Sequence, residues 1–305
     1  MSLIQCLTSI SLAAVTLSTL YAEPGCPKNV DSLTLRVVQS SLIVVPVQIN
    51  HSGPYDFLVD TGAEVTTVDS SLASDLRLEP KGTTGVDGVV THARDTFAYL
   101  DLVEAGTHSV ADSLAVIEDL AQLKAADPRI RGILGENFLG HFDMLIDNRQ
   151  HILCLDDSNT LAAAVKGEHL ALAEPRGSQV DLPFTRPLIV AAKLSALDPT
   201  PVLLRLDSGS NAALLYSENS RIRKGSITPA SRLKSVVNGT EQAFAVLPPQ
   251  DIQVGKRAVH QVVFVMPMNV VGNGVTPRED GLLPTMAFQR VFISYEARYA
   301  TLEPW

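Results

Sequence analysis

Basic residues, cysteines and aromatic residues are all scarce in this chain of 305 residues. It has 24 Lys and Arg residues against 33 Asp and Glu residues, which gives a formal net charge of -9 at pH 7. Nucleic acids and acidic lipids bind basic surfaces, so this balance argues against both kinds of partner. Aromatic residues make up 5% of the chain, which has 19 glycines and 18 prolines. This composition fits a turn-rich β protein better than a helical bundle.

The usual sequence patterns of a metal site are also missing. There is no Cys-x-x-Cys pair and no His-Glu-x-x-His motif, and the seven histidines are scattered. Structural and catalytic zinc sites normally show such clustered ligands. We therefore expect neither a metal nor a cofactor.

The chain has no clear membrane span after its first 22 residues. Residues 7–20 are apolar or small, a stretch that is short for a span, and polar residues follow from position 23. We interpret residues 1–22 as a signal peptide and predict export to the periplasm or the exterior. No Lys or Arg precedes the apolar stretch, so a misplaced start codon and an uncleaved anchor are the alternatives.

Of the three cysteines, only two remain once the signal peptide is removed. Cys6 leaves with that peptide, whereas Cys26 and Cys154 stay in the mature chain. An oxidising compartment would allow them to form a disulfide that fixes the N-terminal segment to the first half of the chain. Two unpaired cysteines, with Cys154 buried in an apolar strand, fit the sequence equally well.

Two segments of the chain share one design. In each, an apolar run is followed by an aspartate that begins a turn, and then by a hydroxyl residue, a glycine and a small residue. The two turns are Asp60-Thr61-Gly62-Ala63 and Asp207-Ser208-Gly209-Ser210. A lone carboxylate among apolar side chains is costly unless a partner shares its charge. Two carboxylates held close together cannot both ionise easily and can share one proton. The repeat therefore predicts that Asp60 and Asp207 form a pair.

The second half of the chain repeats the order of the first. Asp207 follows Asp60 by 147 residues, and the apolar segment 152–155 recurs at 299–302 with the same offset. The apolar segment 132–135 recurs as 281–284, although its final glycine becomes Pro284. Such agreement in order and spacing indicates an internal duplication. We expect a signal peptide at 1–22, an N-terminal lobe at 23–160, an interlobe linker at 161–179 and a C-terminal lobe at 180–305.

On these motifs, each half resembles a retropepsin-like domain, and the tandem resembles a bilobed, pepsin-type aspartic protease. The resemblance covers nearly all of the mature chain. It implies an all-β fold with two related β-barrel-like lobes and a few short helices. It also implies an aspartic endopeptidase that hydrolyses peptide bonds with a water activated by Asp60 and Asp207. Such an enzyme needs no cofactor, acts on a peptide or protein, and here would be a monomer whose two lobes form an intramolecular pseudo-dimer.

The resemblance also assigns supporting roles around the two aspartates. The hydroxyls of Thr61 and Ser208 would bond to the opposite lobe. Gly62 and Gly209 would permit a sharp turn and the approach of substrate, because they lack a Cβ atom. Gly135 would let its strand pass close beneath the Asp60 turn. Its counterpart Pro284 departs from this pattern and could shift the strand beneath Asp207, which leaves open a second half that only supports the first.

The residues after the two glycines differ between the halves. Ala63 has no hydrogen-bonding side chain, whereas the hydroxyl of Ser210 could donate to a neighbouring carboxylate. A hydrogen bond to the charged form favours ionisation. We therefore predict that Asp207 is the more readily ionised aspartate and acts as the base, and that Asp60 acts as the acid.

The glycine-rich segment from residue 82 onward is the candidate flap. In the resemblance, this region closes over an extended peptide that binds by strand-like hydrogen bonds. Gly85 and Gly88 are its candidate contacts with substrate. A plain surface loop is the alternative, because the aromatic residues Phe97 and Tyr99 come late for a flap.

Two other arrangements remain compatible with the sequence. A non-catalytic exported protein could keep the acid-protease fold and bind peptides. Retention of both Asp-hydroxyl-Gly triplets favours the enzyme, since a binder does not need a costly pair of carboxylates. The lobes could also pair between two chains, although the intramolecular arrangement has the higher effective concentration.

Overall fold

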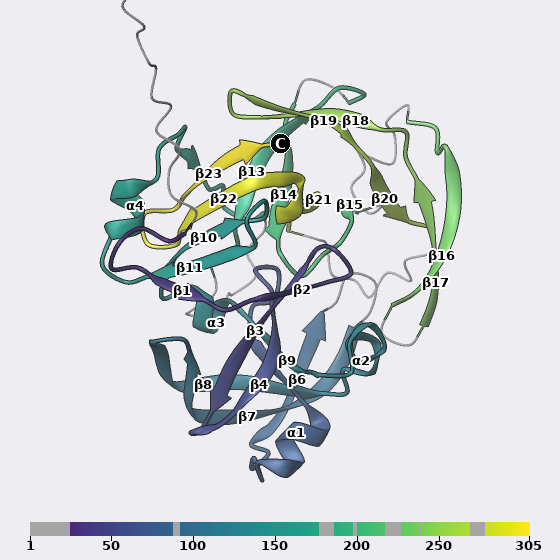
Figure 1. Ribbon diagram of the computed structural model, residues 1–305. Coiled ribbons are helices and arrows are strands. Elements are labelled where there is room, and N and C mark those ends of the chain that lie inside the picture. The colour runs from purple at the N-terminus through teal and green to yellow at the C-terminus, as the bar shows by residue number, and fades with distance from the viewer. Residues whose placement is uncertain are drawn as a thin grey trace, which may run out of the picture.

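Three β-sheets make up most of the structure, a computed structural model that describes residues 25–87, 92–176, 186–197, 200–216, 227–237, 240–268 and 278–305. Strands dominate and the helices are short, so the predicted all-β class is confirmed. Figure 1 shows one lobe below, a second lobe above, and a third sheet that contains strands from both halves.

The lower lobe is built on an eight-stranded sheet in the order β2-β3-β4-β9-β5-β8-β7-β6. Its strands are β2 (Arg36–Val38), β3 (Leu42–Ile49), β4 (Ser52–Val59), β5 (Thr66–Asp69), β6 (Gly82–Asp87), β7 (His92–Ala105), β8 (His108–Glu118) and β9 (Ile130–Leu134). The central strand β4 pairs antiparallel with β3 and parallel with β9. Its last three residues are buried on both faces, which explains why the sequence is continuously apolar there.

The upper lobe is built on a nine-stranded sheet in the order β16-β17-β20-β15-β21-β14-β13-β18-β19. Its strands are β13 (Ile189–Leu194), β14 (Val202–Asp207), β15 (Ala213–Leu215), β16 (Ser231–Val237), β17 (Thr240–Val246), β18 (Gln250–Val254), β19 (Arg257–Val262), β20 (Phe264–Pro267) and β21 (Gly281–Pro284). Here β14 lies between an antiparallel β13 and a parallel β21. The arrangement of β3, β4 and β9 in the lower lobe therefore recurs, as an internal duplication requires.

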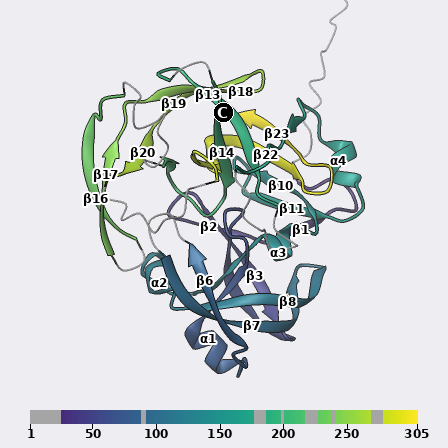
Figure 2. The ribbon, with the colours of Figure 1, turned by 180° about the vertical axis from the view of Figure 1, so that it is seen from behind.

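The third sheet joins the two halves in the order β1-β11-β10-β22-β23-β12. Its strands are β1 (Asp31–Leu33), β10 (Asp143–Asp147), β11 (Ile152–Asp156), β12 (Leu170–Ala171), β22 (Phe288–Ser294) and β23 (Tyr299–Pro304). At its centre, β10 and β22 run antiparallel with Leu145 opposite Phe292. These two residues differ by the same offset as the two aspartates, so an approximate twofold axis passes between them. Figure 2 shows this sheet from behind.

The helices of the described chain are short. Helix α1 (Ser70–Asp75) begins after Asp69, whose carboxylate accepts a hydrogen bond from the backbone N–H of Ser71. Helix α2 (Ala121–Ala126) ends two residues before Pro128. The others are α3 (Glu136–Leu139), α4 (Thr160–Ala164) and the 3-10 helix η1 (Thr285–Ala287). Helix α4 lies at the start of the predicted linker.

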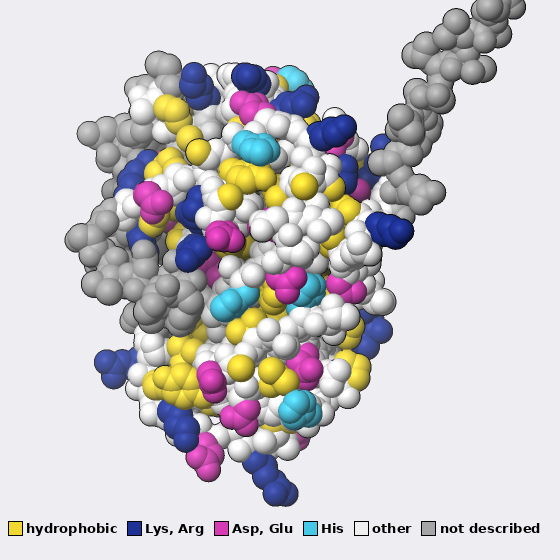
Figure 3. All heavy atoms as spheres, turned by 90° about the vertical axis from the view of Figure 1, so that its left-hand side faces the viewer, with side chains coloured by type: hydrophobic (Ala, Val, Ile, Leu, Met, Phe, Trp, Pro, Cys, Tyr) yellow, Lys and Arg dark blue, Asp and Glu magenta, His cyan; other side chains and the backbone are white. Residues whose placement is uncertain are grey.

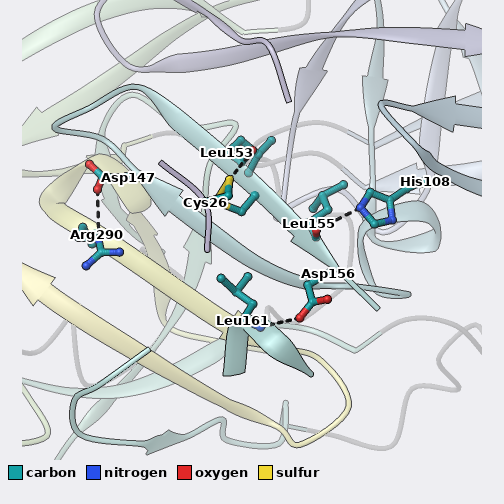
Figure 4. Close-up of a disulfide and its surroundings, with 9 residues drawn as sticks. Cys26, His108, Asp147, Leu153, Leu155, Asp156, Leu161 and Arg290 are labelled. Carbon is teal, nitrogen blue, oxygen red and sulfur yellow. Dashed lines mark hydrogen bonds and ion pairs between the residues drawn. A yellow bond between two sulfur atoms is a disulfide. The ribbon is translucent and has the colours of Figure 1, made fainter. Parts of the chain in front are cut away.

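A disulfide fixes the start of the described chain to the third sheet. Cys26 and Cys154 are bonded, with their Cα atoms 5.7 Å apart, which resolves the question that the sequence leaves open. Figure 4 shows the bond beside β11 and, nearby, the ion pair between Arg290 and Asp147. Residues 1–22, the predicted signal peptide, lie outside the described residues. Within the described part of the chain, no helix combines the length and apolar character needed to cross a membrane.

Charged side chains are distributed over the surface of both lobes. On the face seen in Figure 3, acidic and basic side chains are interspersed, with small groups of apolar side chains between them. Over the whole chain, acidic residues outnumber basic residues. Mixed charge of this kind suits a soluble surface more than a dedicated polyanion-binding face.

Candidate active site

Strands β4 and β14 bring the two aspartates to one place between the lobes. Asp60 follows the last residue of β4, and Asp207 is the last residue of β14. Each carboxyl group lies directly over the glycine of the other turn. A Cβ atom built on Gly209 would lie 2.3 Å from Cγ of Asp60, and one built on Gly62 would lie 2.8 Å from Cγ of Asp207. The absence of a side chain at these glycines therefore makes room for the opposite carboxyl group.

A crossed set of hydrogen bonds locks the two turns together. The hydroxyl of Thr61 donates to the carbonyl of Leu206 at 2.9 Å and accepts from the N–H of Ser208 at 3.0 Å. Symmetrically, the hydroxyl of Ser208 donates to the carbonyl of Val59 at 2.8 Å and accepts from the N–H of Thr61 at 3.1 Å. All of these groups are buried, so breaking one bond would leave an unsatisfied polar atom. The bonds fix the positions of the two aspartates relative to each other.

The two carboxyl groups have different hydrogen-bond donors. Asp60 accepts from the backbone N–H of Gly62 at 2.7 Å and of Ala63 at 3.2 Å. Asp207 accepts from the N–H of Gly209 at 2.8 Å. Burial raises the pKa of both groups, and the charge of Asp60 raises the pKa of Asp207 further, to well above its ordinary value. The backbone donors to Asp60 oppose this rise, so the pKa of Asp207 is raised more strongly than that of Asp60.

This arrangement contradicts the predicted role of Ser210. The sequence predicts that its hydroxyl donates to Asp207 and makes that aspartate the base. The structure shows the hydroxyl donating to the carbonyl of Ala212 at 2.8 Å. A hydroxyl has one hydrogen to donate, so it is not available to Asp207. The structure therefore gives Asp207 no hydrogen bond from Ser210, and the additional donor at the site is the backbone N–H of Ala63, which bonds to Asp60.

The two lobes differ at one position beneath the turns, which is Gly135 in the first lobe and Pro284 in the second. A Cβ atom on Gly135 would lie 2.6 Å from the carbonyl carbon of Val65, so only glycine fits there without movement. Asn137, to which the sequence gives no role, accepts from both the N–H and the hydroxyl of Thr66. In the second lobe, Pro284 lies opposite Asp207 in the parallel pairing of β21 with β14. The proline thus occupies the end of an intact strand.

One of the two predicted flap residues, Gly85, lies on a β-hairpin formed by β6 and β7. Gly85 is in β6 and pairs with Arg94 of β7. Gly88 lies in the segment 88–91, which the structure does not describe. The second lobe has a related hairpin, formed by β16 and β17. Contact between Gly85 or Gly88 and a substrate stays a prediction.

A buried glutamate near the aspartates has no counterpart in the sequence-based site. Glu136 begins α3 and is 1% exposed. One of its carboxylate oxygens accepts from the backbone N–H of Arg186 at 3.2 Å, whereas the other has no hydrogen-bond partner among the described residues. Burial raises the pKa of Glu136 to about 7. The apolar segment 132–135 precedes Glu136, but the sequence assigns this glutamate no role.

Replacing Glu136 by glutamine is expected to change how stability depends on pH. The folded protein keeps the proton on Glu136 up to a pKa of about 7, whereas the ordinary value is 4.5. Folding therefore loses stability as pH rises through this window, by up to about 3 kcal/mol. Glutamine removes that loss, so the variant and the wild type should match near pH 4.5 and diverge toward pH 8. Urea unfolding at both pH values measures the difference.

A matched control separates this effect from general surface charge. Glu303 has a half-exposed side chain, and its change to glutamine should leave the pH dependence of unfolding unchanged. Parallel curves for wild type and Glu136→Gln across the whole range would show that the buried carboxyl does not hold its proton.

Comparison with known proteins agrees with the resemblance of the first motif. Residues 45–138, which include the Asp60 turn and Gly135, match a family model described as aspartyl protease. Among solved structures, a retropepsin-like aspartic protease from Rickettsia conorii is 17% identical, with a TM-score of 0.32; the match covers 41% of this chain and 90% of that chain. A comparison with curated protein sequences gave no match. The family match confirms the predicted resemblance to aspartic proteases for the part of the chain that contains the Asp60 turn.

Proposed function

We propose that this chain is an aspartic endopeptidase in which Asp60 and Asp207 activate a water molecule. One observation carries the proposal: crossed hydrogen bonds hold two buried aspartates over the glycines of the opposite turns. Burying two carboxyl groups side by side is costly for folding. A paired, singly protonated site of this kind is suited to acid–base chemistry.

The chemistry follows from the unequal surroundings of the two carboxyl groups. The ionised Asp60 takes a proton from water, and the water oxygen bonds to the carbonyl carbon of the scissile peptide. Asp207 gives its proton to the carbonyl oxygen, so that a neutral tetrahedral diol forms. Asp60 then protonates the amide nitrogen as the carbon–nitrogen bond breaks, and a diol proton returns to Asp207. The products are a carboxylic acid and an amine, and the pair again holds one proton.

The two hairpins suggest how a peptide would be held. In these hairpins, β6 and β16 are the edge strands of the sheets of their lobes, so each has one side with backbone donors and acceptors that no described strand of the sheet pairs with. An extended peptide could bind by adding strand-like hydrogen bonds to such hairpins. We propose that the substrate is a peptide or protein segment in an extended conformation, and that Gly85 and Gly88 lie beside it.

We further propose that the protein is exported and acts as a monomer, with lobes at 23–160 and 180–305 joined by a linker. The disulfide between Cys26 and Cys154 supports an oxidising compartment. The shared six-stranded sheet and the crossed hydrogen bonds support pairing of the lobes within one chain. If lobes of two different chains paired instead, the same sheet and the same crossed hydrogen bonds would have to form between the chains.

Peptide cleavage and inhibitor binding test the proposed function together. The mature protein should cleave members of a peptide library between pH 3 and pH 7. An inhibitor with a hydroxyl group in place of the tetrahedral diol, of the pepstatin type, should block cleavage and raise the unfolding temperature at acid pH. Peptide binding without cleavage at any pH would instead identify a non-catalytic peptide-binding protein.

A further inference from the structure

A buried arginine breaks the symmetry of the two lobes. Arg205 lies on β14, two residues before Asp207, and its side chain is 9% exposed. The offset between the halves places Leu58 at the corresponding position of β4. Leu58 is also buried, but it packs in an apolar cluster with Val44 and Ile130. One lobe therefore brings a cation to a position that the other fills with an apolar side chain.

The guanidinium group of Arg205 reaches the turn of the opposite lobe. Its Nη1 atom donates to the carbonyl of Gly62 at 3.0 Å. On its other side, Nε lies 3.2 Å from Oε1 of Glu279, and Nη2 donates to Oε2 at 3.5 Å. Because Glu279 is buried too, the ion pair satisfies two groups that would be costly to bury alone. Arg205 thus links the second lobe to the Asp60 turn.

A single peptide unit connects Arg205 to Asp60. The carbonyl of Gly62, which accepts from Arg205, belongs to the same peptide unit as the N–H of Ala63. That N–H donates to Oδ1 of Asp60. A cation on the carbonyl orients the unit and polarises it, which makes its N–H a better donor. At the equivalent unit of the other turn, Leu58 has no group that could donate.

We propose that Arg205 is a positioning residue that selects Asp60 as the ionised aspartate by holding the peptide unit between Gly62 and Ala63. The inference rests on the proposed function and goes beyond it, because it explains why two similar turns give carboxyl groups with different tasks. In this inference, Arg205 takes the place of Ser210 as the residue that makes the two aspartates unequal. Arg205 acts through the turn and through its charge, and it makes none of the contacts of a reacting group.

The charges around Arg205 are consistent with this role. Burial alone would lower its pKa, but the neighbouring acidic groups more than offset burial and raise the pKa above its ordinary value. Arg205 therefore stays charged wherever the enzyme is folded, and it lowers the pKa of both aspartates. The titratable groups that face it or share its surroundings are Asp60, Asp207, Glu64, Glu136, Tyr216, Glu279 and Tyr295.

The test compares pH–rate profiles of variants that change one charge at a time. Arg205→Leu copies the side chain of the opposite lobe. We expect its acidic limb to move up by about half to one pH unit, because the aspartates lose a nearby cation. We expect kcat to fall roughly tenfold or more with KM little changed, since the turn is held less well. Arg205→Lys keeps the charge and should recover most of the acidic limb.

Glu279→Gln should shift the acidic limb of the pH–rate profile in the opposite direction. It removes the anion that neutralises Arg205, so the acidic limb should move to lower pH. The double change of Arg205 to Leu and Glu279 to Gln covers the case in which Arg205→Leu alone fails to fold. It leaves no buried unpaired charge from this ion pair, and its acidic limb should still lie above that of Glu279→Gln.

Arg290→Leu is the matched control. It breaks the ion pair with Asp147 between β22 and β10, without contact to either turn. Its acidic limb should stay where it is in the wild type. An Arg205→Leu or double variant with an unmoved acidic limb would overturn the inference while leaving the proposed function intact. Absence of turnover and of inhibitor binding in the wild type would instead remove the proposed function.

Discussion

Asparagine in place of Asp60 or Asp207 is expected to reduce peptide hydrolysis by roughly a thousandfold or more. In the proposed mechanism, the ionised Asp60 accepts a proton from water and Asp207 donates one to the carbonyl oxygen. Asparagine can do neither, although it keeps nearly the same shape. Each variant should therefore fold normally and lose turnover, with kcat falling far more than KM changes. Initial rates on one cleavable peptide, across the active pH range, measure both values.

The two variants also test the unequal roles of the carboxyl groups. Near-normal turnover by Asp207→Asn would remove the second lobe from the mechanism. Asp75→Asn is a suitable control, because Asp75 is exposed and its ion-pair partner is Arg131. That variant should keep wild-type activity. Circular dichroism and the unfolding temperature of each purified protein would show that lost activity does not come from lost structure.

The sequence predicts the fold and the position of the aspartates because these depend on local pattern and on repetition. Apolar runs before Asp60 and Asp207 indicate buried strands, and both aspartates follow or end such strands in the structure. The constant offset between the halves predicts a duplicated unit. The structure shows the same offset in the crossed bonds of Thr61 and Ser208 and in the pairing of Leu145 with Phe292. Residues related by duplication occupy equivalent places, so one half predicts the other.

Features that depend on which hydrogen-bond partner a group finds in the folded chain were not predictable in this way. Residue type does not say that the hydroxyl of Ser210 donates to the carbonyl of Ala212. Every residue except proline has a backbone N–H, so the sequence does not indicate that the N–H of Ala63 donates to Asp60. Arg205 lies where duplication would predict an apolar residue like Leu58, and only the folded chain shows that it reaches Gly62. The departures from repetition therefore mark the places where the two lobes differ in role.

Adding a methyl group at Gly209 is expected to separate the two carboxyl groups and to remove most activity. In the folded chain, the Cβ atom of Gly209→Ala would lie 2.3 Å from Cγ of Asp60 and 2.4 Å from its Oδ2. Real Cβ atoms do not approach other heavy atoms so closely, so Asp60 or the turn must move. Displacement of a reacting group by about 1 Å can cost roughly a hundredfold in rate. The crowding should also reduce stability, by roughly 1–3 kcal/mol.

The reciprocal change at Gly62 should have a smaller effect of the same kind. Its Cβ atom would lie 2.8 Å from Cγ of Asp207, which requires less movement. We therefore expect the order of activity to be wild type, then Gly62→Ala, then Gly209→Ala. Ser210→Ala is the neighbouring control, because the Ser210 hydroxyl donates away from the aspartates, to Ala212. It should keep turnover within a few-fold of wild type and leave the acidic limb unmoved.

Inhibitor affinity distinguishes displaced aspartates from a lost fold. A folded Gly209→Ala protein with displaced carboxyl groups should bind a pepstatin-type inhibitor much more weakly than the wild type does, because the inhibitor hydroxyl needs both groups at once. Wild-type affinity and turnover in that variant would mean that Asp60 does not lie over Gly209 in the working enzyme. The close approach of each carboxyl group to the opposite glycine, and with it the pairing proposed for catalysis, would then have to be abandoned.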